Sequence, residues 1–488
     1  MLFNSYEFIF IFLPISFFIY FYLNKKRLTI ASKSWLIFAS LAFYSWWNIS
    51  YLPLILISIL FNYTISQSMI SYNNKSKKII EKKRILQIGL VLNIAFLGYF
   101  KYMDFFIENI NWSLNTNLSL MHLALPLAIS FFTLQQIAFL IDSYEGLVKE
   151  KNLLDYIIFV TFFPQLIAGP IVHHQEIMPQ FASIKTKVIN YKNISIGLFI
   201  FTIGLFKKVV IADTFAPWAN MGFDVADKLN FFEAWMTSLS YTFQLYFDFS
   251  GYTDMAIGAA LLFNIKLPIN FNSPLRATGI IDYWQRWHIT LTNFITTYVY
   301  TPILRSFNKV TFLKAMLATF IAMLISGIWH GAGWTFIIWG ILHGIALIIN
   351  HYWKKSKRKI NKILAWFITF NFINITMVIF RAKDIDDIIK VLTGMFNGQI
   401  VFSRHLYEYL PSMHNLVEFG PWLQNIGGNK YTVISLIVAF LIVLVVKNTI
   451  QWAENIKFNT LYLSSGIFML TLSLLKLHKV SEFLYFNF

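Results

Sequence analysis

The chain has 488 residues, of which 57% are hydrophobic and 13% charged, against roughly 25% charged in a soluble domain. Its formal net charge is +17, but the basic residues cluster beside apolar runs, at 25–27, 75–84 and 354–362. That placement is typical of the inner loops of membrane proteins and argues against nucleic-acid binding. The absence of cysteine excludes disulfides, thiolate metal sites and a cysteine nucleophile. We therefore expect a single integral membrane domain over residues 1–488.

Long apolar runs predict an all-α fold with about eleven transmembrane helices, since about 20 apolar residues cross the hydrocarbon core. These runs lie at 6–23, 34–48, 51–70, 85–103, 119–141, 193–212, 311–327, 331–350, 363–380, 431–447 and 460–476. Shorter or interrupted runs lie at 154–172, 231–247, 252–265 and 290–304. We expect these shorter runs to be re-entrant or buried in protein rather than facing lipid.

The charge of the linkers predicts the orientation of the chain. The first run carries Glu7, lacks a preceding basic segment and is followed by basic residues, so we expect an uncleaved helix with Met1 outside and Lys25 inside. The linker 104–118 has no Lys or Arg and is expected outside. After the apolar core, residues 385–396 predict an amphipathic helix, followed by an exposed loop.

One candidate site is the segment Ser-Gly-Ile-Trp-His-Gly-Ala-Gly-Trp at 326–334, between two apolar runs. An ionisable residue at membrane depth is a functional candidate by default, which singles out His330. Its three glycine neighbours let backbone or ligand approach closely, and Trp329 and Trp334 supply aromatic walls. A neutral imidazole there can accept a proton from a hydroxyl. The alternative is a packed core histidine that donates to a carbonyl of another helix.

A second candidate is the segment Asp-Tyr-Trp-Gln-Arg-Trp-His-Ile-Thr at 282–290. On a helix, Trp284 and His288 would share a face, and Asp282 and Arg286 would pair at i, i+4. Arg286 could bind a phosphate or carboxylate, and His288 could donate or relay a proton. The alternative is an interfacial amphipathic helix with a tryptophan belt and a snorkelling arginine.

A third candidate is the stretch 244–256, where Asp248 and Asp254 flank a Ser-Gly pair and Tyr252. The two carboxylates could orient a histidine or bind a cationic group. Helix capping and support of neighbouring side chains is the alternative.

The other histidines are weaker candidates. His343 lies thirteen residues beyond His330, about 220° round a continuous helix, so we expect it to point away. His173 and His174 follow a Gly-Pro pair in an expected re-entrant loop. No pair has carboxylate support at a metal-ligand spacing, so we predict no metal.

The motifs resemble those of the membrane-bound O-acyltransferase family. The similarity rests on Tyr-Trp-Gln-Arg-Trp-His-Ile-Thr-Leu-Thr at 283–292 and Gly-Ile-Trp-His-Gly-Ala-Gly-Trp at 327–334. His288 and His330 would be the two hallmark histidines of the family. Residues 125–135, 162–170 and 244–256 also look like its bacterial branch, which O-acylates envelope polysaccharides. The similarity covers most of the chain and is weakest in the last hundred residues.

The resemblance implies helices around a funnel or tunnel, with a catalytic core at about 119–350 and a buried histidine near the base. It implies catalysis by His330 and His288, with Trp284, Arg286, Trp329, Trp334, Asp248, Tyr252 and Asp254 lining the substrate path. Acetyl-CoA would be the donor substrate, with no permanently bound cofactor, and the protein would sit among the lipids of a bacterial inner membrane. An SGNH-hydrolase-like periplasmic partner would receive the acetyl group.

The expected acceptor is peptidoglycan, with alginate-type exopolysaccharide or teichoic acid as alternatives. Residues 292–302 lack the Arg-Asp pair and Gly-Gly-Asn turn of the alginate-type pattern, which disfavours alginate. A different class stays open: a transporter or flippase whose histidines and carboxylates relay protons. Transporters often carry inverted repeats, and we find no internal symmetry here.

Overall fold

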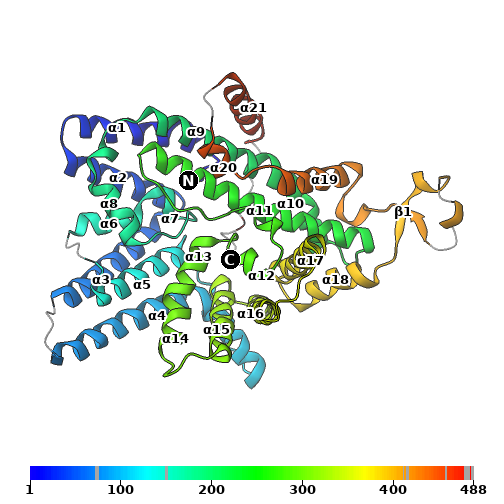
Figure 1. Cartoon of the computed structure of the whole chain (residues 1–488), viewed down its shortest axis with the longest axis horizontal. Helices are drawn as coiled ribbons and strands as arrows, with labels where there is room; N and C mark the ends of the chain where they lie inside the picture. The colour runs from blue at the N-terminus through cyan, green and yellow to red at the C-terminus, as the bar shows by residue number, and fades with distance from the viewer. Residues whose placement is uncertain are drawn as a thin grey trace. The chain divides into compact units, whose positions relative to one another are not determined.

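The chain folds almost wholly into helices, as Figure 1 shows, which confirms the all-α prediction. The computed structural model describes residues 1–71, 76–148, 152–409, 411–413, 417–456, 459–477 and 484. Within these residues, the only strands are β1 (Val401–Ser403) and β2 (Glu418–Gly420), which pair in parallel. The chain divides into two compact units. The first holds Met1–Leu205, Gly251–Asn270 and the part from Ala453 onward, and the second holds Phe206–Ser250 and Phe271–Trp452.

Each unit has its own set of helices. The first unit contains η1 (Glu7–Phe12), α1 (Leu13–Lys25), α2 (Thr29–Ser45), η2 (Ile49–Tyr51), α3 (Leu52–Ser71), α4 (Ser76–Leu114), α5 (Ile129–Glu145), α6 (Leu153–Thr161), α7 (Phe163–Leu166), α8 (His174–Ala182), η3 (Ile184–Lys187), α9 (Tyr191–Phe206) and α21 (Thr460–Lys476). The second contains η4 (Lys207–Ala212), α10 (Asp213–Asn220), η5 (Met221–Val225), η6 (Pro274–Arg276), α12 (Ile280–Trp284), α13 (Ile289–Ile295), η7 (Thr296–Tyr300), α14 (Thr301–Arg305), α15 (Phe312–His330), α16 (Trp334–Lys355), α17 (Lys362–Arg381), α18 (Ile385–Asn397), η8 (Arg404–Leu406), η9 (Pro411–Met413), η10 (Gln424–Ile426) and α19 (Lys430–Val445). Helices α11 (Phe231–Leu262) and α20 (Thr449–Glu454) contribute residues to both, as does α9 through Phe206.

Seven of the described helices are long and apolar enough to cross a membrane, which establishes a multi-pass membrane protein. They are Glu7–Lys25, Ile49–Ser71, Ile80–Leu114, Tyr191–Val225, Phe312–His330, Trp334–Lys355 and Lys362–Arg381. Two further apolar helices, α19 and α21, have 16 and 17 residues. The runs at 34–48 and 119–141 correspond to α2 and α5, with 17 residues each. At 1.5 Å per residue, such helices span about 25 Å, short of the roughly 30 Å hydrocarbon core.

Helix α11 is continuous where the sequence predicted two segments interrupted by a Ser-Gly pair. In the first unit, α9 and α11 approach so closely that a Cβ atom on Gly204 would lie 2.5 Å from the carbonyl oxygen of Gly251. Gly251 therefore serves helix–helix contact rather than a break, a common role of small residues in membrane bundles. Asp248 and Asp254 consequently lie inside a helix, so the capping role considered for them is wrong.

Helices α15 and α16 also meet backbone to backbone. A Cβ atom on Gly327 would lie 2.4 Å from the carbonyl oxygen of Phe336, and one on Gly340 would lie 2.8 Å from that of Met323. The space left by the missing side chain of Gly327 is thus taken by the neighbouring helix. This contact determines how His330, three residues further along α15, is placed beside α16.

The amphipathic helix predicted at 385–396 is confirmed as α18. Asp384 caps its first turn by accepting a hydrogen bond from the backbone N–H of Asp387 at 2.9 Å. Its buried residues include Ile388, Val391 and Met395, which recur at the three- and four-residue spacing of one helix face.

The orientation of the chain gives a testable prediction. Asn74, the natural inner-loop probe, lies in 72–75, outside the described residues, but Ser356 in the basic linker after α16 and Asn115 after α4 are both exposed. Because Lys and Arg are retained on the cytoplasmic side, a membrane-impermeant maleimide applied to intact cells should label Asn115→Cys and spare Ser356→Cys. The chain has no native cysteine to interfere. Labelling of position 356 with protection of 115 would invert the topology.

Candidate active site

His330 is the last residue of α15 and is held among aromatic rings. The backbone leaves the helix at Gly331, and α16 begins three residues later at Trp334. The imidazole is 6% exposed. Its ring centroid lies 5.0 Å from that of Trp329, 5.2 Å from Trp339 and 5.2 Å from Phe380. Three helix segments thus enclose this histidine within the second unit.

His288 lies next to His330, with 6.5 Å between the two ring centroids. Its backbone adopts the left-handed conformation, φ 44° and ψ 51°, immediately before α13. A non-glycine residue in this region is uncommon and often marks a functional site. The ring of Phe249 covers it edge-on at 4.9 Å, and Trp329 lies 6.4 Å away. The structure therefore brings together the two histidines that the motifs singled out.

Burial keeps His288 uncharged. The side chain is 1% exposed and lies outside the long spanning helices. Desolvation of the charged form lowers the pKa of His288 to about 3, so its imidazole is neutral at physiological pH. A neutral imidazole has one nitrogen that can accept a proton and one that can donate.

The left-handed backbone of His288 shows that the prediction of one helix over the segment 282–290 is wrong. Helix α12 ends at Trp284, so Trp284 and His288 do not share a helical face. The predicted i, i+4 ion pair is present, since Arg286 Nε donates to Asp282 Oδ1 at 2.6 Å. Arg286 also donates to the carbonyl oxygen of Asn272 at 3.3 Å. The guanidinium, one-third exposed, is therefore held beside the histidine segment rather than in the ring cluster.

His343 belongs to the same cluster, and the prediction that it points away is wrong. The 220° angle assumed one continuous helix, whereas Gly331 leaves the helical path and α16 starts anew. His343 Nδ1 accepts a hydrogen bond from the indole N–H of Trp284 at 3.2 Å, and its Nε2 lies 3.1 Å from Thr376 Oγ1. Its ring centroid is 4.5 Å from that of Trp339, which in turn packs on His330.

The remaining predicted site residues are placed as follows. Trp329 is buried against both histidines, whereas Trp334 is 56% exposed at the start of α16. Tyr252 and Asp254 belong to the first unit, where Tyr252 stacks on Phe3 with 4.7 Å between ring centroids. Asp248 belongs to the second unit and pairs with Lys208.

Sequence reasoning missed Lys208, which forms a buried ion cluster. Its Nζ lies 2.6 Å from Asp248 Oδ1 and 3.0 Å from Asp213 Oδ1, and the side chain is 2% exposed. Asp248 directly precedes Phe249, the residue that covers His288. A lysine inside the apolar run 193–212 was the available signal, because such residues are costly at membrane depth.

Sequence reasoning also missed Trp339. Its buried indole N–H has no hydrogen-bond partner among the described residues, although its ring packs against His330. A buried donor without a partner is rare, and near a reactive group it is suited to an oxygen atom of a substrate. The sequence signal for Trp339 was its position four residues before His343, because residues at this spacing lie on the same face of a helix.

The two glycines after His330 differ in a way that can be tested. A Cβ atom on Gly331 would lie 2.1 Å from Cε2 of Phe336, whose ring packs 5.1 Å from Phe380 beside His330. A Cβ atom on Gly333 would meet nothing closer than 3.6 Å. Gly331→Ala should displace these rings and lower turnover by about 10²-fold, the effect of a 1 Å misplacement.

Gly333→Ala is the matched control and should retain near-wild-type turnover in the same acetyl-transfer assay. Elution as a single folded species from size-exclusion chromatography separates lost geometry from lost folding. Equal activity of the two alanine variants would contradict a role for the Phe336 and Phe380 rings in positioning His330.

The fold and the site define a class of protein: a polytopic membrane protein with two adjoining buried histidines enclosed by tryptophans. The sequence matches the membrane-bound O-acyltransferase (MBOAT) family over residues 76–382, and the chain belongs to this family. It is therefore a membrane-bound acyltransferase, as the resemblance of the motifs implied.

Relatives of the chain carry related activities. Over its full length the chain is 45% identical to a peptidoglycan O-acetyltransferase of Helicobacter pylori and covers 98% of that protein. It is 36% identical, over 81% of its length, to a protein of Pseudomonas aeruginosa named probable alginate O-acetylase AlgI, of which it covers 75%. It is 27% identical, over 53% of its length, to a teichoic acid D-alanyltransferase of Bacillus subtilis, of which it covers 69%.

Proposed function

We propose that the chain transfers acetyl groups from cytoplasmic acetyl-CoA across the bacterial inner membrane for O-acetylation of peptidoglycan. The observation that carries this proposal is the buried pair His288 and His330 in a chain 45% identical, end to end, to a peptidoglycan O-acetyltransferase. An SGNH-hydrolase-like periplasmic protein is the proposed receiver of the acetyl group. The proposed donor carries phosphates, which the basic inner segments of the chain would attract.

The proposed chemistry centres on His330. As a general base, its imidazole takes the proton of an acceptor hydroxyl while the hydroxyl oxygen bonds to the acetyl carbon. The carbon–sulfur bond breaks, and the proton passes to the sulfur to give the free thiol of coenzyme A. As a nucleophile, the imidazole would instead carry the acetyl group for one step, and the same bonds would break and form overall. Both routes need a buried, neutral imidazole.

Trp339 is a candidate for stabilising the reaction. The carbonyl oxygen of the thioester gains negative charge when its carbon is attacked, and donors aimed at it lower the barrier. The ring of Trp339 packs against His330, and its buried indole N–H has no partner among the described residues, so we assign it this donor role. His343 would hold Trp284 and Trp339 in place through one hydrogen bond and one ring contact.

The acceptor can be identified from the cell wall. Deletion of the gene should remove base-labile acetate from purified peptidoglycan, with restoration by the wild-type gene and none by a His330→Ala copy. Teichoic-acid and exopolysaccharide esters should stay at wild-type levels. Unchanged acetate on peptidoglycan, with loss from another polymer, would reject peptidoglycan while leaving acyl transfer intact.

A transporter or flippase with a proton relay is the competing class. Purified protein in proteoliposomes should release free coenzyme A from acetyl-CoA, detected with a thiol reagent, in the absence of a proton gradient. Vesicles without protein give the background rate. Strict dependence on an imposed gradient, with no cleavage of the thioester, would favour the transporter.

His288→Ala should lower the rate of thioester cleavage, but less than loss of His330, since a catalytic base contributes about 10²–10⁴-fold. The ring of His288 packs 6.5 Å from that of His330 and is flanked by Phe249 and Trp329, which suits a positioning or proton-relay role. Single-turnover rates of the two alanine variants and of the double variant make the comparison. Equal and complete loss in all three would show that the histidines act as one catalytic unit.

A further inference from the structure

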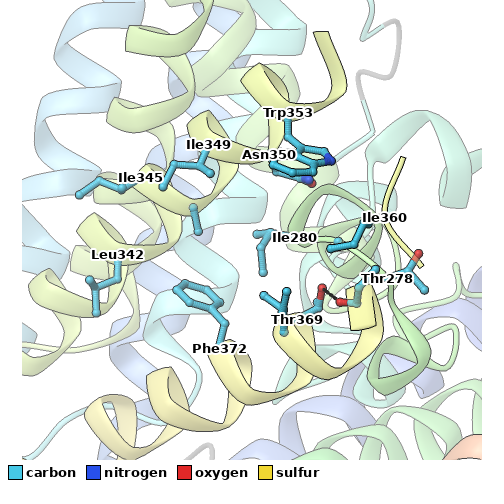
Figure 2. A pocket seen from close by; sticks show the side chains of 14 residues that line it. Thr278, Ile280, Leu342, Ile345, Ile349, Asn350, Trp353, Ile360, Thr369 and Phe372 are labelled. Atoms are coloured by element: carbon cyan, nitrogen blue, oxygen red, sulfur yellow. Dashed lines mark hydrogen bonds between the residues drawn. The ribbon is translucent and has the colours of Figure 1, made fainter. Parts of the chain in front are cut away.

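A cavity of about 480 Å³ lies between α16 and α17, as Figure 2 shows. One of its lining residues, Phe372, packs 5.3 Å from the ring of His343, on the side of α16 that faces the histidine cluster. This volume is within the roughly 300–1,000 Å³ of small-molecule sites. Its walls include one face of α16, formed by Leu342, Ile345, Ile349 and Trp353 at three- or four-residue spacing. Phe372 from α17 and Ile280 from α12 lie opposite. The cavity is therefore built from three helices of the second unit.

The lining is apolar and open to the surface of spanning helices. Ile349 and Ile368 are more than half exposed, on helices that are long and apolar enough to cross the membrane. The polar Asn350 is engaged, since its Oδ1 accepts a hydrogen bond from the backbone N–H of Ile281 at 3.0 Å. A hydrocarbon chain thus fits the cavity better than a polar solute does.

One end of the cavity leads into the most basic segment near it. Trp353 and Ile360 both line the cavity, and between them α16 ends and the basic linker begins. Six cations lie within nine residues: Lys354, Lys355, Lys357, Arg358, Lys359 and Lys362. All are exposed, and none pairs with a carboxylate in the part of the chain that the structure describes. The segment therefore offers a concentration of positive charge at the mouth of an apolar cavity.

We propose that this cavity binds an anionic phospholipid, with an acyl chain between α16 and α17 and the headgroup phosphate against the 354–362 segment. Both halves of such a lipid match the surface they would meet, hydrocarbon against the isoleucine-rich face and anionic phosphate against the cations. The proposal goes beyond acyl transfer and does not depend on which polymer is acetylated. It commits to a membrane lipid rather than the acyl donor.

Fluorescence quenching tests the proposal, because Trp353 lines the cavity. The purified chain is reconstituted in phosphatidylcholine vesicles with increasing brominated phosphatidylglycerol, and the quenching of Trp353→Phe is subtracted from that of wild type. Saturable quenching by phosphatidylglycerol, without equal quenching by brominated phosphatidylcholine, is expected. Equal quenching by both lipids would overturn headgroup recognition.

Two variants separate the charge from the cavity. Substituting Lys357, Arg358 and Lys359 by Gln should weaken the apparent affinity by about 10²-fold, from about fivefold for each cation. Ala346→Phe, which places a ring inside the cavity, should abolish the saturable signal. The matched control replaces Lys25, Lys26 and Arg27 by Gln, three exposed cations at the end of α1, and should leave the affinity unchanged.

Further outcomes decide against the proposal. Equal weakening by the control triple variant would show non-specific attraction to the bilayer. Release of the lipid signal by acetyl-CoA would assign the cavity to the donor. Full binding by Ala346→Phe would place the lipid elsewhere. Each of these results leaves the proposed acetyl transfer untouched, because turnover is measured separately.

Discussion

Replacing His330 by alanine is expected to lower acetyl transfer by about 10²–10⁴-fold, and further if the imidazole carries the acetyl group. The side chain lies at a helix end, enclosed by Trp329, Trp339 and Phe380, and 6.5 Å from His288. Trp339 and Phe380 also pack on each other, with 5.3 Å between their ring centroids, so we expect the fold to survive the loss of the imidazole. Release of coenzyme A by purified protein is the measurement, with thermal unfolding in detergent as the check on folding.

His351→Ala is the matched control for this change. His351 lies on α16, eight residues beyond His343, and is partly exposed outside the ring cluster. Its loss should leave turnover and unfolding temperature near wild type. A His330→Ala protein that keeps a tenth or more of wild-type activity would remove His330 from the mechanism and return it to the role of a packed core histidine.

The second large effect is expected on stability, from Lys208. Its ammonium group is buried with Asp248 at 2.6 Å and Asp213 at 3.0 Å. Removing one partner from a buried ion cluster leaves uncompensated charge and typically costs about 3–5 kcal/mol. Lys208→Ala removes the cation that both carboxylates contact and should lower the unfolding temperature in detergent strongly. Asp248→Asn keeps the Lys208–Asp213 pair and should cost less.

Lys383→Ala provides the control for Lys208. Lys383 pairs with Asp224 at 3.0 Å, but its side chain is 68% exposed, so the pair should contribute only about 0–1 kcal/mol. If Lys208→Ala does not accumulate, Lys208→Arg retains the charge and should recover folded protein. An unfolding temperature of Lys208→Ala equal to that of wild type would show that the cluster does not stabilise the fold.

The Lys208 cluster also connects stability with the site. Asp248 is followed by Phe249, whose ring covers His288. Displacement of this turn of α11 would free the ring and alter the position of His288. The rate of thioester cleavage by Asp248→Asn should therefore fall by more than the loss of folded protein, as judged from its unfolding temperature, would explain.

The sequence by itself determined the membrane class and the two principal histidines. The length and hydropathy of the apolar runs suffice to predict membrane-spanning helices, because the bilayer requires a minimum helix length and admits few charged residues. The rarity of polar groups at membrane depth drew attention to His330. The Asp282–Arg286 pair was predicted from i, i+4 spacing, and it forms although α12 ends at Trp284, because the turn that follows keeps the two side chains close.

Only the tertiary structure decided which distant residues complete the site. Lys208 and Asp213 are five residues apart on one helical stretch, but Asp248 reaches Lys208 only through the packing of α11 against that stretch. His343 joins the cluster because the glycine-rich link after His330 resets the helical phase, so a count of 100° per residue no longer applies across it. Gly251 proved to be a point of helix contact rather than a break, because an intact hydrogen-bond ladder outweighs the roughly 1 kcal/mol cost of an interior glycine. Such outcomes depend on contacts between remote segments, which local spacing does not encode.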